Sequence, residues 1–534
     1  MSLSRKSRVP LPESGVTVRH SGEHPYVYKV DKAFRNAKGQ PDNQRTLIGK
    51  LDQDSGLLIP NMRYYEIYGA AQVGLEPAYE SVRSIGATFL MRRLLNDLGC
   101  AGILKEVLGP RRAELALTAC AYMACRGNVM EHVLDFCEGY TLQEAPLSPQ
   151  LASWLFASIS RDERMAFFRS WVARQPTPQY LAYDVTSFST YAQGISNAEW
   201  GYNRDGERLP QINLGCYVVQ NSGLPVFYVT YPGSIVDKSH LPHMLAYNDE
   251  LGIRDFGLVL DRGFCSTANV SYLKDTGLRF ILGVELRHKT VRNAVASVRG
   301  DVTSLRYRIK QGIHARRVPG RYYGVAANLH IYYDPILAEE QRRDLLRRVE
   351  AQEEKLAQLE ELTRREAKRY GAFLDLERQH DGSFTYERNY GRIDAASLNC
   401  GFFCLLTDQE LDSEEVLNLY RRRELIESGF DELKNHVDMR RLKTHNDQTT
   451  DGKLFCAFVS IIAVCAINGR MGEYMAKHSV SKDAIIRELE KVKVITMVDG
   501  RRLMNPLTKR QRQLYGLVGI SEEDVQAYVR ESAG

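Results

Sequence analysis

The order of apolar segments between residues 179 and 284 constrains the fold most strongly. Three runs rich in β-branched and aromatic residues come first: QYLAYDVTSFST, RLPQINLGCYVVQ and LPVFYVTYPG. A helical segment at about 239–251 follows, then the short run FGLVLD, the helical segment NVSYLKDTG and the run LRFILGV. This order, β-β-β-α-β-α-β, predicts an α/β domain.

The segments before this region have two different patterns. Residues 1–20 are expected to be flexible. Residues 21–75 alternate β-formers with polar Gly/Asn/Asp clusters and carry six cations from Lys29 to Lys50, which predicts a small basic β-rich unit. Such a unit can grip phosphates, although an ordinary solvated surface explains the cations about equally well. Apolar residues recur at helical spacing across residues 76–175, which predicts a helical domain.

The segments after it also differ from one another. Residues 285–410 combine short β-like runs with a highly charged stretch at about 339–370, which predicts a long exposed helix or helical hairpin with a thin apolar stripe. Helices are expected at 411–436, at about 450–476 and at about 482–494. The last segment, 477–534, is basic and is expected to be helical.

Composition excludes several classes of protein. The 534 residues carry a net charge of only +5, which is compatible with nucleic-acid binding but does not demand it. Ten cysteines without a C-x-x-C pair argue against a zinc site or a disulfide framework and for reduced thiols in a cytoplasm. The longest apolar run, Leu454 to Ile467, is shorter than the ~20 residues that span a bilayer, so we expect a buried helix and no membrane partner.

Three carboxylates stand out by their position. Asp184 lies inside an apolar strand, Asp261 ends the strand FGLVLD, and Glu427 lies on a later helix. A carboxylate inside a sheet is costly unless it is paired or binds a metal. If the sheet is ribonuclease-H-like, its first and fourth strands are neighbours, so Asp184 and Asp261 meet and a helix after the fifth strand brings Glu427 over them. Any one such aspartate, taken alone, is more often a turn or capping residue.

The helix that carries Glu427 gives the sharpest signal. At about 100° per residue, Tyr420, Arg423, Glu427 and Lys434 share one face, and an apolar stripe beside it docks the helix on the sheet. The guanidinium of Arg423 can clamp a phosphate in a bidentate way, and Lys434 can meet another phosphate as a point charge. Taken singly, the arginine run would be a solvated face and the tyrosine a packing residue; the shared spacing favours a site.

These residues resemble a known family. Tyr420-x₂-Arg423-x₃-Glu427-x₆-Lys434 matches at every spacing the Y-R-E-K signature of the insertion sequence 4 superfamily of DDE transposases. The run Asp-Arg-Gly-Phe at Asp261 is similar to the second-aspartate block of that family, and YDVTSFS is similar to the first. The segments YVYKV…RTLIGKLDQDSGLLIP and RRLMNPLTKRQRQLYGLVGI resemble the insertion sequence 1634 branch, so the resemblance touches nearly the whole chain.

The resemblance implies an α/β, ribonuclease-H-like catalytic domain formed by residues 176–284 and 411–476, with an inserted α+β region at 285–410. It is preceded by the β-rich DNA-binding unit and the helical domain. Asp184, Asp261 and Glu427 would be catalytic ligands of two Mg²⁺ or Mn²⁺ ions, and Tyr420, Arg423 and Lys434 would contact DNA. The expected partners are double-stranded DNA, as terminal inverted repeats and target, and a second copy of the chain. The expected location is a prokaryotic cytoplasm, at the nucleoid.

Relatives that resolve their ends through a DNA hairpin use a tryptophan of the insertion to stack on a flipped base. The tryptophans here, Trp154, Trp171 and Trp200, all lie outside the insertion, so Tyr322 or Tyr323 is the candidate substitute. Two other functions compete with an active transposase. One is a catalytically silent, transposase-derived DNA-binding protein or repressor, which the presence of all three acids disfavours. The other is a nuclease that cuts without joining, which strand-transfer assays would separate.

Overall fold

The N-terminal unit is a four-stranded antiparallel sheet. The computed structural model describes residues 8–21, 24–35, 39–68, 79–142, 146–176, 180–359, 362–379 and 383–532. The sheet consists of β1 (Val16–Ser21), β2 (His24–Arg35), β3 (Pro41–Leu51) and β4 (Leu58–Pro60), and α1 (Met62–Tyr68) follows it. We expected residues 1–20 to be flexible, but residues 16–20 pair with β2; residues 1–7 lie outside the described residues.

The next segment is helical, with one strand at its start. Its helices are α2 (Gly86–Asp97), α3 (Cys100–Leu108), α4 (Pro110–Arg126), α5 (Val133–Tyr140), α6 (Pro149–Ser158) and α7 (Arg161–Arg174). Local sequence explains their ends, since Pro110 begins α4 and a capping box of Ser160 and Glu163 begins α7. The strand β5 (Tyr79–Ser84) precedes them and was not predicted.

The partner of β5 comes from the far end of the chain. The C-terminal segment contains α18 (Lys482–Leu489), β16 (Lys493–Met497), β17 (Arg502–Met504), α19 (Lys509–Gly516) and α20 (Glu522–Glu531). The helix expected at 482–494 ends at Leu489, because β-branched residues follow and β16 pairs antiparallel with both β5 and β17. The segment 477–534 is therefore mixed rather than wholly helical.

The central sheet has eight strands in the order β11-β12-β15-β10-β9-β6-β7-β8. Its first five strands in the chain are β6 (Tyr180–Ser189), β7 (Gln211–Val219), β8 (Pro225–Pro232), β9 (Gly257–Leu260) and β10 (Arg279–Val284). β6, β7 and β8 form an antiparallel meander, whereas β9 runs parallel to both β6 and β10. The first and fourth strands are thus neighbours, which is the ribonuclease-H-like order expected from the sequence.

Three strands of the segment 285–410 extend the same sheet. They are β11 (His314–Tyr322), β12 (Val325–Tyr333) and β15 (Phe402–Thr407), and β15 pairs antiparallel with β10. The predicted insertion is therefore continuous with the central sheet, because the apolar run FFCLLT pairs beside β10. Its remaining elements are α11 (Lys289–Val298), α12 (Pro335–Leu356), α13 (Arg364–Tyr370), β13 (Leu374–Arg378), β14 (Phe384–Arg388) and α14 (Tyr390–Ser397).

The charged stretch forms two helices, as the helical-hairpin interpretation allowed. α12 begins at an Asp334 cap and buries Leu345, Val349 and Leu356, which belong to a separate small core with the β13–β14 hairpin. Leu346 is 44% exposed, because Leu345 rather than Leu346 shares the buried face of α12 with Val349 and Leu356.

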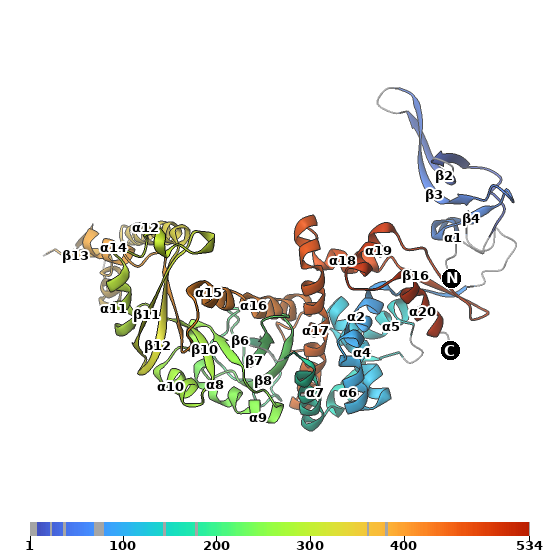
Figure 1. Cartoon of the computed structure of the whole chain (residues 1–534). Helices are drawn as coiled ribbons and strands as arrows, with labels where there is room; N and C mark the ends of the chain where they lie inside the picture. The colour runs from blue at the N-terminus through green and yellow to red at the C-terminus, as the bar shows by residue number, and fades with distance from the viewer. Residues whose placement is uncertain are drawn as a thin grey trace.

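Helices cover both faces of the sheet (Figure 1). α8 (Asp237–Leu245), α9 (Tyr247–Leu251) and α10 (Thr267–Asp275) lie on one face, and α15 (Ser413–Arg421) and α16 (Glu424–Asp431) lie on the other. α17 (Asp447–His478) stands between the sheet and the helical segment and packs on α4 and α6. Among the described residues it alone is long and apolar enough to cross a membrane, but 83% of its most apolar stretch is buried within the protein.

Candidate active site

The three predicted carboxylates converge where β6 and β9 lie side by side. Asp184 is on β6, one residue beyond the pairing of Tyr183 with Leu260, and Asp261 directly follows the last residue of β9. Glu427 lies on α16, which packs over β6 and β7. Two neighbouring strands of the sheet therefore hold two of the acids close together, and the covering helix brings the third acid to them.

One guanidinium contacts all three acids. Arg423 Nη1 lies 2.8 Å from Glu427 Oε1 and 3.6 Å from Asp184 Oδ2, and Arg423 Nη2 lies 3.8 Å from Asp261 Oδ1. The Arg423 side chain is only 15% exposed. A fourth neighbour, Tyr420, donates a hydrogen bond of 3.2 Å from its hydroxyl to Asp261 Oδ1, and its ring lies 5.5 Å from the guanidinium carbon.

Burial controls the electrostatics of this cluster. It raises the pKa of Asp184 to about 6, against the opposing effects of the Val185 backbone N–H and Arg423, and the like charge of Asp261 adds to the rise. Burial also raises the pKa of Tyr420 to about 12, and Asp261 adds to that effect. For Arg423, burial alone would lower the pKa, but Tyr420 and the three carboxylates raise it, so the guanidinium stays charged.

A glycine on the fifth strand makes room for this arrangement. A Cβ atom at Gly283 of β10 would lie 2.8 Å from the Tyr420 hydroxyl and 3.0 Å from the Arg262 backbone nitrogen. Gly283 therefore permits Tyr420 to reach Asp261. Sequence reasoning missed it, although its place on the strand next to Asp261 was a usable signal.

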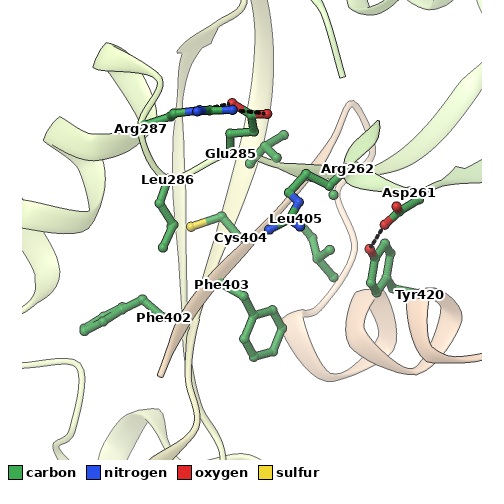
Figure 2. A pocket seen from close by; sticks show the side chains of 12 residues that line it. Asp261, Arg262, Glu285, Leu286, Arg287, Phe402, Phe403, Cys404, Leu405 and Tyr420 are labelled. Atoms are coloured by element: carbon green, nitrogen blue, oxygen red, sulfur yellow. Dashed lines mark hydrogen bonds and ion pairs between the residues drawn. The ribbon is translucent and has the colours of Figure 1, made fainter. Parts of the chain in front are cut away.

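A cavity of about 590 Å³ opens beside Asp261 and Tyr420 (Figure 2). Phe402 and Phe403 line its apolar part, and Arg262 and Arg287 contribute cations, with Arg287 paired to Glu285. The cavity is open to solvent next to the carboxylates, and its lining combines aromatic and cationic groups. We did not predict this cavity, because its wall requires β15 to pair with β10.

Lys434 is placed differently from the expected helix face. The predicted helix 411–436 is broken at Arg422–Arg423 between α15 and α16, and it ends in a π-helical turn, Glu432–His436. The rotation per residue changes in this turn. A helix face that is assigned with a constant rotation per residue is therefore wrong for residues beyond Asp431. The Lys434 side chain is buried and its Nζ lies 2.7 Å from Asp205.

The tyrosines proposed for base stacking are not available for it. Tyr322 is 4% exposed, and Tyr323 is 6% exposed with its ring stacked on His288 at a centroid distance of 4.0 Å. Both side chains are used in packing at the turn between β11 and β12. An exposed aromatic is needed to stack on a base, and neither tyrosine is exposed in this structure.

The three carboxylates have the donor chemistry of a divalent-cation site, but a guanidinium lies between them. Mg²⁺ prefers carboxylate oxygens as ligands, and oxygens of all three acids here lie 2.8–3.8 Å from the nitrogens of Arg423. In this arrangement no group of three or more His, Cys, Asp or Glu side chains among the described residues is close enough to hold a metal. The donor chemistry fits, since three hard oxygen ligands surround one cationic position, but the guanidinium holds that position.

Comparison with known proteins identifies the family. A family model described as a transposase DDE domain matches residues 175–462, which is more than half of the chain and includes all three acids. The chain belongs to the DDE transposases. As a member of that family it is an enzyme of DNA transposition, and DNA is its substrate.

Two other comparisons add little to this transposase assignment. No curated protein matches the chain. Among solved structures, the piggyBac transposase synaptic complex with hairpin DNA, determined by cryo-electron microscopy, is similar with a TM-score of 0.37 and 10% identity, over 84% of this chain and 85% of that chain. That likeness is remote.

Proposed function

We propose that this transposase cuts and joins DNA where β6 and β9 lie side by side in the central sheet, with Asp184, Asp261 and Glu427 as the ligands of divalent cations. The observation that carries the proposal is the convergence of these three acids, from two strands and one helix, on a single positive group. Carboxylates from separate elements gather at such cost only where a cation compensates them. Mg²⁺ or Mn²⁺, two per site, fits oxygen ligands of this kind.

The protein's own residues would position the substrate around these acids. Bound cations would polarise the attacking oxygen and stabilise the leaving one in phosphodiester cleavage and joining. Tyr420 orients the Asp261 carboxylate through its hydrogen bond. Arg262 and Arg287 at the neighbouring cavity offer cationic contacts to DNA phosphates, and Lys434 becomes available to DNA only if its pair with Asp205 opens.

The motif resemblance supports a finer assignment. The Y-R-E-K spacing and the terminal segments favour the insertion sequence 4 superfamily and its 1634 branch, which implies cleavage at terminal inverted repeats by a dimer in a prokaryotic host. The basic four-stranded sheet at the N-terminus is the candidate for end recognition. Its hairpin β2–β3 projects away from the rest of the molecule, where a duplex can reach it (Figure 1).

The decisive experiment is cleavage of a DNA fragment that carries the element's own end, with Mg²⁺ or Mn²⁺. Glu427→Gln keeps the side-chain shape and removes the charge, so we expect end binding to persist and cleavage to fall by about 10³-fold or more. Glu424→Gln is the matched control, because this acid lies on the same helix and is exposed. Equal cleavage by wild type and Glu427→Gln would remove Glu427 from the site.

The silent repressor is the second candidate. It would bind the end without cutting under conditions that support pairing of two ends. The intact carboxylate cluster disfavours it, since a protein that only binds DNA has no use for three converging acids.

A further inference from the structure

Arg423 is held as a partner of carboxylates. Its guanidinium contacts Asp184, Asp261 and Glu427, and the side chain is 15% exposed. The sequence suggested that this arginine clamps a DNA phosphate, but its donors are directed at protein acids instead. A phosphate clamp would need the guanidinium to leave these contacts first.

The three acids surround the Arg423 guanidinium, but they leave part of its hydrogen-bonding capacity unused. Only the 2.8 Å contact with Glu427 is within hydrogen-bond distance, and the contacts of 3.6 Å and 3.8 Å with the two aspartates exceed the 2.7–2.9 Å of a strong charge-assisted bond. The Arg423 Nε atom is buried and has no hydrogen-bond partner among the described residues. The arrangement is thus held by charge more than by directed bonds, which makes it replaceable by a smaller cation.

The acids in turn need a positive group between them. Asp184 is a largely buried carboxylate near a second acid, and unpaired charges in such a place are strongly destabilising. The Arg423 guanidinium lies between the three acids, where metal ions would bind under the proposed function. Arg423 and those ions therefore compete for one place.

We propose that Arg423 is an internal counter-ion: it holds the three carboxylates together before metal binds, and metal binding displaces it from between them. This inference rests on the proposed function. Displacement frees the guanidinium for a DNA phosphate, and linkage makes the coupling reciprocal. DNA that draws Arg423 away raises the affinity of the acids for metal, so the site is completed only when substrate and metal are both present.

Metal affinity tests the competition directly. We would measure Mn²⁺ binding by electron paramagnetic resonance without DNA for wild type, Arg423→Gln and Arg422→Gln. Arg422 is the matched control, because it is the exposed neighbour whose side chain contacts Asn221 rather than the acids. We expect Arg423→Gln to bind Mn²⁺ about tenfold more tightly than wild type, and Arg422→Gln to match wild type. Unchanged or weaker binding by Arg423→Gln would overturn the inference.

Chemical labelling of the wild-type protein covers the case in which Arg423→Gln does not fold. Phenylglyoxal modification of arginine, read by peptide mass spectrometry, should increase at Arg423 when Ca²⁺ or Mn²⁺ is added and stay constant at Arg422. Labelling of Arg423 that does not change while Mn²⁺ binds contradicts displacement and leaves the proposed function standing. If wild type binds no Mn²⁺, or Glu427→Gln binds it equally well, the proposed function fails instead.

Discussion

The positions and the protonation of active-site residues depend on the residues that surround them. Tyr420 reaches Asp261 only because residue 283 has no side chain, and Arg262 approaches the same backbone. Burial raises the pKa of Asp184 to about 6 even with Arg423 beside it, since the charge of Arg423 opposes the rise. The site thus depends on space and on charge compensation together.

Gly283→Ala tests the dependence on space. The added Cβ would meet the Tyr420 hydroxyl at 2.8 Å and the Arg262 backbone at 3.0 Å, so Tyr420 must move away from Asp261. We expect cleavage to fall by about tenfold or more, since small displacements of positioning groups are costly, with a loss of about 1–3 kcal/mol in stability. Gly300→Ala is the control, because its Cβ meets nothing within 4 Å. Full activity in Gly283→Ala would show that the Tyr420 contact is dispensable.

Tyr420→Phe isolates the hydrogen bond from the packing. The substitution removes the 3.2 Å bond to Asp261 and keeps the ring beside Arg423. We expect cleavage to drop by about tenfold or more, because one hydrogen bond to a charged group contributes about 1.5–3 kcal/mol. The melting temperature should fall by a few degrees at most, because the buried ring is retained. A rate equal to wild type would assign the tyrosine to packing alone.

At the scale of the elements, α17 links the central sheet to the helical segment formed by α2 to α7. It packs on α4 and α6 and buries most of its length, yet it carries Lys453 with a relative exposure of 2%. Lys453 Nζ donates to Asn128 Oδ1 at 2.9 Å, and Asn128 donates to the Asp438 carbonyl, just beyond the π-helical turn. Burial lowers the pKa of Lys453 to about 7, and the charge of Lys443 adds to that effect.

This buried lysine predicts a pH dependence of stability. Between pH 7 and about 10.5 the unfolded chain binds a proton at Lys453 that the folded chain does not, so stability falls as the pH is lowered through this window. We expect the free energy of unfolding, measured with urea, to decrease by roughly 2–3 kcal/mol between pH 9 and pH 7 from this group. Lys453→Met should flatten that dependence. An equally steep dependence in the variant would assign it to other groups.

Strand pairing and helix packing join the start of the helical segment to the C-terminal segment of the chain. β5 precedes the helical segment, and β16 lies more than 400 residues later, yet they form one antiparallel pair. Leu514 and Tyr515 of α19 are fully buried, and the Tyr515 hydroxyl donates to the Gly86 carbonyl at the start of α2. By contrast, the N-terminal sheet has a small core of its own, formed by Val9, Val27, Ile48, Leu58 and Tyr64.

Two deletions test whether the N-terminal sheet and the C-terminal segment contribute differently to the stability of the main core. Removing residues 1–74 leaves the main core intact, so we expect the remainder to melt within a few degrees of the full chain and to lose end binding in a gel-shift assay. Removing residues 493–534 exposes β5 and the apolar surface under α19, so we expect an insoluble or much less stable product. Solubility and thermal melting check both outcomes. A stable product of the second deletion would contradict the role given to the β5–β16 pair.

The sequence by itself determined the strand order, the positions of the three acids and the existence of most helices. Periodicity and turn residues are local signals, and Asp184 and Asp261 could be located because each interrupts or ends an apolar run. The first and fourth strands were expected to be neighbours on the condition that the sheet is ribonuclease-H-like, and the structure confirms that they are.

Only the tertiary structure decided which distant segments pair and which side chains share a site. The β5–β16 pair, the extension of the sheet by β15 and the contact of Lys434 with Asp205 join residues far apart in the chain, and no local pattern specifies them. The π-helical turn after Asp431 also altered a helix face that a constant 100° repeat had assigned. Spacing placed Arg423 four residues before Glu427 and on the same side of the chain, but its partners were decided by the low exposure and converging charges of the folded site.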